Sequence, residues 1–412
     1  MPSRGEAPVL PDVFDALGIR PIINAVGYAT RVSGSCPHPD VVAAMAAASS
    51  EYFEIDDLLN AASRLIAEAT GAEAGIVTCG AGAALSLAAA ACLAGNRPEI
   101  MDELPDVAGC PRNEIVFPIP GPFDYDHALR LSGAKLVLVD YHAPDVTENG
   151  GALRQIEQAI SAKTAAIGYV WLEVTERPNL AALADLAHRH GLPLIVDAAC
   201  ALPPAENLAA FSRDGADLIA YSGGKHLGGP QASGILCGRE ELIRSAWVQM
   251  VDMDVRNGTW SLQHWVERGW ISRPPRHGIG RSMKVSKEAI VGVMAALRRY
   301  GTRDHAGEYA AWGAIIDEIE AGLRDLPELR ITRQPCGANG QPYPNLRIES
   351  AGLPVRDLLH ALHHRPRRIL LAEDERSPNL AVLYAQCLKP SDAAEIVAAI
   401  RQIVTTHREQ AP

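Results

Sequence analysis

The sequence has no Cys-x-x-Cys pair and no cysteine spacing typical of zinc sites, because its eight cysteines are scattered singly. This pattern argues against a disulfide scaffold and favours a reduced, cytoplasmic setting. Residues 1–10 lack the apolar core of a signal peptide. The chain also lacks a run of roughly 18 apolar residues, the length that a membrane helix needs. We therefore expect a cytoplasmic protein with no membrane partner.

An excess of positive charge is absent as well. The 412 residues include 38 Lys and Arg against 49 Asp and Glu, which gives a net charge of −11. This balance provides no general attraction for nucleic acid or for anionic membrane surfaces, so we expect no nucleic-acid partner. Local arginines still allow small anionic substrates. Hydrophobic residues make up 48% of the chain, enough to bury one core in a large domain and another in a smaller one.

What the sequence does contain is one lysine among glycines, in the stretch 221–230, Tyr-Ser-Gly-Gly-Lys-His-Leu-Gly-Gly-Pro. Glycine lets a backbone turn sharply and approach a ligand closely, so the position of Lys225 favours contact with a bound molecule. Apolar runs at 216–220 and 232–237 predict a buried strand on either side. Lys225 is therefore expected on a tight turn at a sheet edge.

This turn does not fit a phosphate-binding loop. Ile219 stands where that motif needs its first glycine, and His226 replaces the required Ser or Thr. A lysine that forms a Schiff base with pyridoxal phosphate fits better. The apolar run 194–196 ends in Asp197, 28 residues before Lys225, and a carboxylate is the group that pairs with the pyridinium nitrogen of this cofactor.

Five motifs resemble fold-type I pyridoxal-phosphate enzymes, and within them the family of selenocysteine synthase and D-glucosaminate-6-phosphate ammonia-lyase. The resemblance implies pyridoxal 5'-phosphate as the cofactor, Lys225 and Asp197 as catalytic residues and a small amine as the substrate. It also implies a homodimer or a higher even homo-oligomer, since the family builds its active site between two subunits. The motifs, in chain order, are Asn24-Ala25-Val26-Gly27, Cys79-Gly80-Ala81-Gly82-Ala83-Ala84, Val196-Asp197-Ala198-Ala199, Ser222-Gly223-Gly224-Lys225 and Gly280-Arg281-Ser282-Met283-Lys284-Val285.

The second of these motifs is expected to hold the cofactor phosphate. A predicted strand at 74–78 leads into a glycine turn and a helix, and backbone N–H groups at a helix N-terminus bind phosphate. Two alternatives remain open. One is a dinucleotide site, although Leu85 stands where its third glycine should be, and the other is helix packing on small residues. The expected phosphate contacts are the backbone of Gly80, Ala81, Gly82 and Ala83 and the hydroxyl of Ser222.

A substrate carboxylate calls for an arginine, whose planar guanidinium matches two oxygens. Arg281 is the first candidate because it lies in a family motif. Arg31 and Arg347 are further candidates, and a plain surface position is an equal alternative for Arg31. Asn24 belongs to the turn that lies by the active site in the family, so it is also expected to contact the substrate.

The segment 124–128 is similar to the family segment that places a side chain over the pyridine ring. Tyr125 or His127 is therefore expected to stack on the cofactor. The preceding residues 119–122, Ile-Pro-Gly-Pro, depart from the basic residues often found in the family. This departure argues against a phosphorylated sugar as the substrate.

Histidines and tryptophans add no further site. His188 and His190 are two residues apart on a predicted helix and face different ways, so no metal site is predicted. His226 either contributes to the site or is a buried structural histidine. The stretch 260–270 carries three tryptophans, suited either to packing inside the domain or to a subunit interface.

Strands alternate with helical segments from residue 114 to 221, which predicts an α/β fold with a mainly parallel central sheet covered by helices on both faces. Asp197 and the turn before Lys225 fall at the carboxyl ends of strands, where such sheets bind ligands. Later elements predict a smaller α+β domain. The expected organisation is an N-terminal arm at 1–36, which could pack with the small domain, a large cofactor-binding domain at 37–285 and a small C-terminal domain at 286–412.

These features predict a lyase of the ammonia-lyase type that performs α,β-elimination on an amino acid or amino-sugar acid. A racemase or aldolase using the same carbanion chemistry is the alternative. A selenium transferase acting on aminoacyl-tRNA fits less well, because the family core begins near residue 21 and leaves no room for an N-terminal RNA-binding module. A non-catalytic ligand sensor would normally be fused to a DNA-binding module, and none is visible.

Overall fold

The computed structural model describes residues 13–141, 151–171, 178–256, 258–337, 339–374 and 377–410. These residues form two compact units, each with a hydrophobic core of its own. The larger unit contains residues 33–305 and 339–342, and the smaller unit contains residues 13–32, 306–337 and 343–410. Within the described ranges, no helix combines the length and apolarity needed to cross a membrane.

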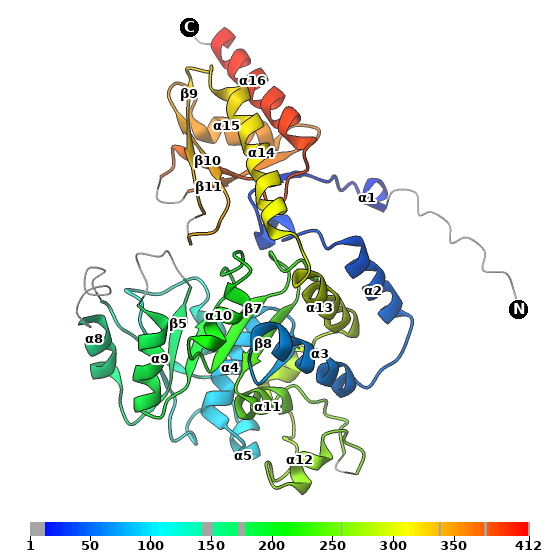
Figure 1. Ribbon diagram of the computed structural model, residues 1–412, viewed down its shortest axis with the longest axis vertical. Helices are drawn as coiled ribbons and strands as arrows, with labels where there is room; N and C mark the ends of the chain where they lie inside the picture. The colour runs from blue at the N-terminus through cyan, green and yellow to red at the C-terminus, as the bar shows by residue number, and fades with distance from the viewer. Residues whose placement is uncertain are drawn as a thin grey trace, which may run out of the picture. The chain divides into compact units, whose positions relative to one another are not determined.

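A seven-stranded sheet forms the centre of the larger unit (Figure 1). The strand order is β2-β8-β7-β6-β5-β3-β4. Strands β7, β6, β5, β3 and β4 pair in parallel, whereas β8 pairs antiparallel with both β2 and β7. The strands are β2 (Ala74–Thr78), β3 (Glu114–Phe117), β4 (Lys135–Leu138), β5 (Thr164–Val170), β6 (Leu194–Asp197), β7 (Leu218–Ser222) and β8 (Gly234–Gly238).

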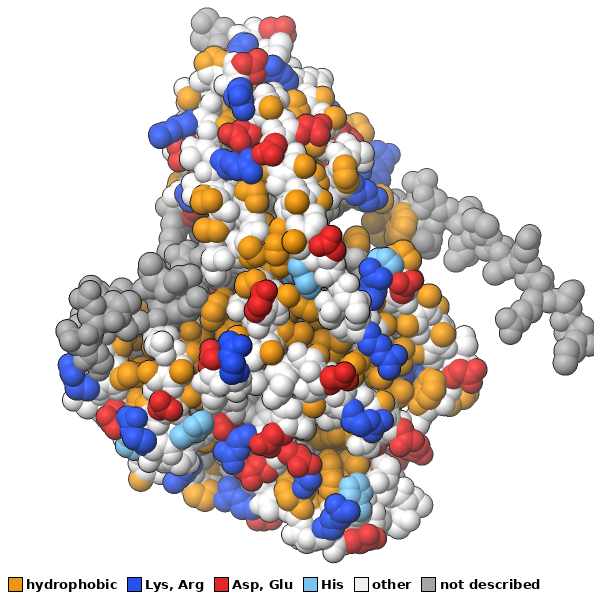
Figure 2. All heavy atoms as spheres, viewed as in Figure 1, with side chains coloured by type: hydrophobic (Ala, Val, Ile, Leu, Met, Phe, Trp, Pro, Cys, Tyr) orange, Lys and Arg blue, Asp and Glu red, His pale blue; other side chains and the backbone are white. Residues whose placement is uncertain are grey.

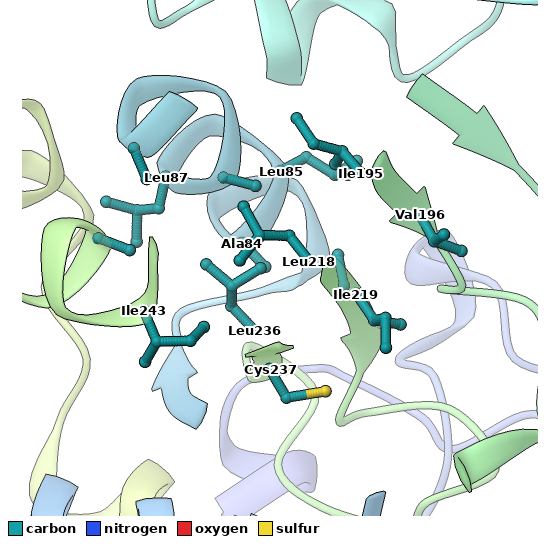
Figure 3. Packing of buried hydrophobic residues seen from close by; sticks show 14 of the residues in the cluster. Ala84, Leu85, Leu87, Ile195, Val196, Leu218, Ile219, Leu236, Cys237 and Ile243 are labelled. Carbon is teal, nitrogen blue, oxygen red and sulfur yellow. The ribbon is translucent and has the colours of Figure 1, made fainter. Parts of the chain in front are cut away.

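Helices cover both faces of this sheet, which explains why its strands are continuous apolar runs. Neighbouring side chains of a strand point to opposite faces, and Figure 3 shows Leu236 directed toward α4 (Ala81–Ala94) while Cys237 points away. On that other face lies α3 (Ile55–Thr70), whose Ile66 side chain packs against Gly75, the β2 partner of Cys237. The expected α/β fold with a mainly parallel sheet is thus confirmed.

The helix α13 (Lys287–Tyr300) packs within the larger unit, although the sequence grouped it with the small domain. Gly292 allows this close packing, since a Cβ there would lie 2.9 Å from the Met45 side chain on α2 (Pro39–Ser49). Arg299 adds an ion pair to Asp40, at 3.0 Å. The other helices of this unit are α5 (Pro98–Met101), α6 (Asp126–Arg130), α8 (Gly151–Ala159), α9 (Leu180–Arg189), α10 (Asn207–Arg213), α11 (Glu240–Val248), α12 (Gln263–Glu267) and the 3-10 helix η3 (Ile279–Met283).

A five-stranded sheet of order β1-β11-β12-β10-β9 forms the smaller unit. The N-terminal arm contributes β1 (Ile23–Ala25), which pairs in parallel with β11 (Ile369–Glu373), and the remaining pairs are antiparallel. Residues 13–32 of the arm therefore belong to the same unit as the C-terminal segment. The other elements are α1 (Val13–Ala16), the 3-10 helix η1 (Thr30–Val32), α14 (His305–Leu323), β9 (Leu329–Gln334), β10 (Asn345–Ser350), α15 (Val355–His363), β12 (Leu380–Tyr384) and α16 (Asp392–Gln410).

The tryptophans of the stretch 260–270 pack inside the larger unit. Trp260 and Trp265 are buried, and the ring of Trp265 meets those of Trp247 and Trp270 edge-on, with centroids 5.6 and 5.5 Å away. These rings therefore stabilise the core of the unit, and they give no support to a subunit interface at this place.

Candidate active site

Lys225 lies in the turn between β7 and β8, directly after the carboxyl end of β7. The Gly223 amide donates a hydrogen bond to the Ser233 carbonyl at 2.9 Å, which closes the base of the turn. Gly224 is needed because a Cβ at that position would stand 2.5 Å from the Gln231 backbone. The backbone around Lys225 is thus packed tightly, while its own side chain is half-buried.

Asp197 ends β6, the parallel neighbour of β7. The side chain is 7% exposed, and its Oδ1 accepts a hydrogen bond from the Ala199 amide at 3.0 Å. Burial raises the pKa of the Asp197 carboxyl, while the Ala199 amide and the positive charge of Lys225 oppose that rise. A cation placed against this carboxylate would gain a strong interaction in a desolvated setting.

The Lys225 amine donates a hydrogen bond to the thiol of Cys200, with Nζ and Sγ 2.9 Å apart. Burial lowers the pKa of Lys225, but the side chains of Cys200, Tyr125 and Asp197 raise it, and the result is a pKa above the usual value. Cys200 was not among the residues predicted from the sequence. Its position three residues after Asp197, in the same loop, is the signal that could have found it.

The N-terminus of α4 lies beside the β7–β8 pair and is open. Gly80 is the N-cap residue and provides no side-chain hydrogen bond, so the first N–H groups of the helix are left for another partner. A Cβ on Gly80 would meet nothing within 4 Å, whereas one on Gly234 would stand 2.5 Å from the Gly80 carbonyl carbon. Ser222 pairs with Gly234 across the two strands, which places it next to this turn.

Tyr125 immediately precedes α6, which is fixed to α4 by Ser86. The Ser86 hydroxyl donates to the carbonyls of Ala128 at 2.5 Å and of Gly82 at 3.1 Å. Tyr125 is 58% exposed and belongs to the groups that raise the pKa of Lys225. His127 lies in the first turn of α6, is exposed, and is not among those groups. Stacking on the cofactor stays a prediction for both Tyr125 and His127.

These groups together fit pyridoxal 5'-phosphate. They comprise an amine, a buried carboxylate on the neighbouring strand and an uncapped helix N-terminus with free space in front of Gly80. The free N–H groups and the dipole of α4 suit a phosphate. The buried carboxylate suits a protonated pyridine nitrogen.

Arg281 lies in η3 and lines a cavity of about 510 Å³ in the larger unit. Its Nη2 atom is 2.9 Å from Asp252, and its Nε atom is buried without a hydrogen-bond partner among the described residues. Trp247 and Lys284 line the same cavity, and neither Lys225 nor Asp197 does. Arg281, which the sequence predicts as an anion contact, thus lines a cavity that neither Lys225 nor Asp197 borders.

The other three substrate candidates belong to the smaller unit. Asn24 is committed to a local turn, because its Oδ1 accepts from the Val26 amide at 2.9 Å. Arg347 lies on β10, 3.8 Å from Asp374. Arg31 is exposed and borders a cavity of about 600 Å³. That cavity is also lined by three histidines at the end of α15, His360, His363 and His364.

His226 is a buried structural residue. Its Nδ1 lies 3.1 Å from the Tyr300 hydroxyl, and Arg303 donates to its carbonyl at 2.9 Å. These contacts attach the residue after Lys225 to the C-terminal end of α13. His188 and His190 face different ways, as expected, and each pairs with a different carboxylate.

Comparison with known proteins supports the resemblance suggested by the motifs. The model of the family "L-seryl-tRNA selenium transferase" matches residues 41–253. D-glucosaminate-6-phosphate ammonia lyase from Salmonella typhimurium is 31% identical over 321 residues, covering 76% of this chain and 75% of that protein. The 5'-C-glycyluridine monooxygenase-decarboxylase from a Streptomyces species is 30% identical, covering 77% and 72%. A solved structure of D-glucosaminate-6-phosphate ammonia-lyase superposes with a TM-score of 0.75 at 26% identity, covering 96% of this chain and 99% of that one.

Proposed function

Because this chain belongs to the L-seryl-tRNA selenium transferase family of pyridoxal 5'-phosphate enzymes, we propose that it is a lyase of the ammonia-lyase type. The proposed reaction is α,β-elimination on an amino acid or amino-sugar acid. The observation that carries the proposal is the placement of the Lys225 amine and the Asp197 carboxylate after adjacent parallel strands, beside the open N-terminus of α4. Ligands bind such sheets at this edge.

Each part of the cofactor has a proposed partner in the chain. Lys225 would hold it covalently, and Asp197 would pair with the ring nitrogen. The backbone N–H groups of the turn 80–83 and the hydroxyl of Ser222 would hold the phosphate. Tyr125 would lie over the ring. When bound, pyridoxal phosphate supplies an electron sink for negative charge at a substrate carbon.

Lys225 carries out the proton transfers in the proposed reaction. As an amine it accepts the proton from the substrate carbon that bears the amino group, and as an ammonium it donates a proton to the departing β-substituent. The raised pKa of Lys225 favours the second role, because the side chain holds a proton at neutral pH. Asp197 assists without moving, since a fixed charge in a desolvated site stabilises developing charge most effectively.

The substrate is proposed to be an amino acid or amino-sugar acid without a phosphate group. A relative named for a glucosaminate phosphate supports the sugar-acid class. The stretch 119–122, which enters the loop before Tyr125, offers no basic side chain for a substrate phosphate. Arg281 and the arginines of the smaller unit remain the proposed contacts for the substrate carboxylate.

The test is to incubate the purified enzyme in heavy water with D- and L-amino acids and amino-sugar acids. A lyase releases ammonia and a 2-keto acid in equal amounts. A racemase would instead return deuterated amino acid of both hands without ammonia, and this outcome would replace the proposal. The Lys225→Ala variant, which should release no ammonia, controls for background hydrolysis.

A further inference from the structure

The thiol of Cys200 lies within hydrogen-bonding distance of the Lys225 amine, with Sγ and Nζ 2.9 Å apart. Cys200 is exposed, so a small oxidant can reach it. Its loop is anchored on one side by the Asp197–Ala199 hydrogen bond and on the other by Gln341, whose amide donates to the Cys200 carbonyl at 3.4 Å. Hydrogen bonds thus hold both the loop of Cys200 and the turn of Lys225, and this keeps the sulfur and the amine close together.

We propose that Cys200 and Lys225 form an oxidative modification site, at which a peroxide oxidises the thiol and the lysine amine captures the product as a sulfur–nitrogen bond. The reaction requires a nucleophilic sulfur that is accessible, and an amine close enough to attack that sulfur before a second oxidation. Cys200 is exposed and its sulfur lies 2.9 Å from the Lys225 nitrogen, so the pair meets the requirements of access and proximity.

The chemistry proceeds in two balanced steps. In the first, the Cys200 thiolate attacks one oxygen of hydrogen peroxide and the O–O bond breaks. Sulfur loses two electrons and becomes a sulfenic acid, and the hydroxide that leaves takes a proton from the Lys225 ammonium, which gives water and leaves the amine neutral. In the second, the lone pair of neutral Lys225 Nζ attacks the sulfur, the S–O bond breaks, and the departing hydroxide takes a proton from the nitrogen to give a second water. No electrons are gained or lost in this step.

The cross-link would act on the cofactor-free protein. It consumes the amine of Lys225, so pyridoxal phosphate could no longer attach, whereas cofactor already bound to this amine would prevent the second step. Two equivalents of a thiol would reverse the bond, the first by forming a mixed disulfide with Cys200 and the second by reducing it. The bond itself depends only on the two side chains, while its effect on cofactor uptake rests on the proposed role of Lys225.

Other cysteines provide contrasts within the chain. Cys237 is buried, and burial raises the pKa of its thiol to about 12, so it is shielded and stays protonated. Cys36 is exposed like Cys200. The described residues around Cys36 form a cavity of about 130 Å³ that includes two arginines but no lysine. Cys36 therefore serves as the matched control.

The experiment compares the parent with Cys200→Ser, Cys200→Ala and Cys36→Ser, each as the full chain stripped of cofactor. Each protein is treated with hydrogen peroxide, blocked with iodoacetamide, digested and examined by mass spectrometry. In the parent and Cys36→Ser we expect a cross-linked peptide pair containing Cys200 and Lys225, two hydrogens lighter than the sum of the separate peptides. Cofactor uptake, followed by absorbance, should fall at least tenfold on oxidation and return with dithiothreitol.

Two results would overturn the proposal. One is oxidation of Cys200 to its sulfinic acid with no cross-linked pair, whatever happens to cofactor uptake. The other is an equal loss of uptake in the two Cys200 variants, which would place the damage elsewhere. If the cross-link forms but uptake is unchanged, the modification stands and the cofactor role of Lys225 is wrong, so the two proposals fail separately.

Discussion

Gly234 lies directly against the backbone of Gly80. An ideal Cβ on Gly234 would stand 2.5 Å from the Gly80 carbonyl carbon and 2.7 Å from the Ala81 nitrogen, closer than van der Waals contact allows. Strand β8 thus packs onto the turn that opens α4 with no room for a side chain. The proposed phosphate-binding N–H groups belong to this same turn, so the packing of β8 determines where they point.

The first prediction is that Gly234→Ala weakens cofactor binding. The added methyl must displace the turn at Gly80 or distort β8, and overpacking of this kind costs about 1–3 kcal/mol of stability. Urea unfolding of the cofactor-free protein and titration with pyridoxal phosphate measure the two effects. Gly109→Ala is the control, because a Cβ there meets nothing within 4 Å. Equal cofactor affinity in both variants would contradict the prediction.

The second prediction is that Lys225→Ala abolishes the visible absorbance of the bound cofactor and lowers turnover at least about 100-fold, the lower limit expected for loss of a general acid–base group. The fold should persist, because the Lys225 side chain is only partly buried and the turn is held through its backbone. Lys163→Ala, at an exposed position, is the control. A parent-like spectrum in the Lys225 variant would refute the assignment.

The third prediction is that Asp197→Asn lowers activity about 100-fold or more, because a preorganised charge is lost from the site. The same variant should make the cofactor-free protein more stable at neutral pH. The folded state raises the pKa of this carboxyl through burial, so it binds more protons than the unfolded state between the two pKa values. Stability is therefore lost as pH rises from the unfolded value through the folded one, and Asn avoids that loss.

Thermal unfolding of the parent and of Asp197→Asn from pH 3 to pH 8 tests the linkage. The two midpoints should lie closest at low pH, where the aspartate is protonated in both states, and diverge as pH rises. A midpoint difference that does not depend on pH would show that the variant acts through packing alone.

Much of this architecture follows from local sequence. The strand at Ala74–Thr78 has the bounds expected from its apolar run, because a sheet covered on both faces leaves no polar interruption. Lys225 and Asp197 could be identified because Asp197 ends one such strand and Lys225 lies in the glycine turn after another. Glycine spacing and a carboxylate at a strand end are short-range patterns.

Other features depend on contacts between distant segments and left no local trace. The chain breaks between α13 and α14, where Arg303 donates a hydrogen bond to the carbonyl of His226, a residue far away in the sequence. Strand β1 has three residues and pairs with β11, whose residues lie 346 positions later in the chain (Ile23 opposite Ile369), so periodicity could not reveal it. Cys200 and Lys225 lie in two different loops, so the sequence places Cys200 near Asp197 but does not indicate its contact with Lys225.

The smaller unit shows why substrate residues were harder to predict than cofactor residues. Asn24 has the position that the motif implied, but its side chain is used to close its own turn. Arg347 faces a carboxylate, Asp374. An arginine in a sequence indicates a charge, whereas its role depends on neighbours that only folding assigns.

The last prediction is that the protein is a homodimer or a higher even homo-oligomer. Large apolar side chains are exposed on α2, at the start of α3 and on the segment that joins them. Tyr52 is 99% exposed, and Val42, Phe53 and Ile55 are each more than 40% exposed. Figure 2 shows further hydrophobic side chains at the surface, among charged ones. Large apolar side chains exposed on two consecutive helices and their connection are typical of a subunit interface.

Exchanging two of these side chains for charges should weaken the assembly, because a buried carboxylate without a partner opposes association. We expect Tyr52→Glu combined with Phe53→Glu to shift the protein toward monomer in light scattering at micromolar concentration. Leu131→Glu, at a residue that is 56% exposed on α6's C-terminal end, should leave the parent assembly unchanged. A parent protein that is monomeric while loaded with cofactor and active would refute the prediction, since the proposed site would then be complete within one chain.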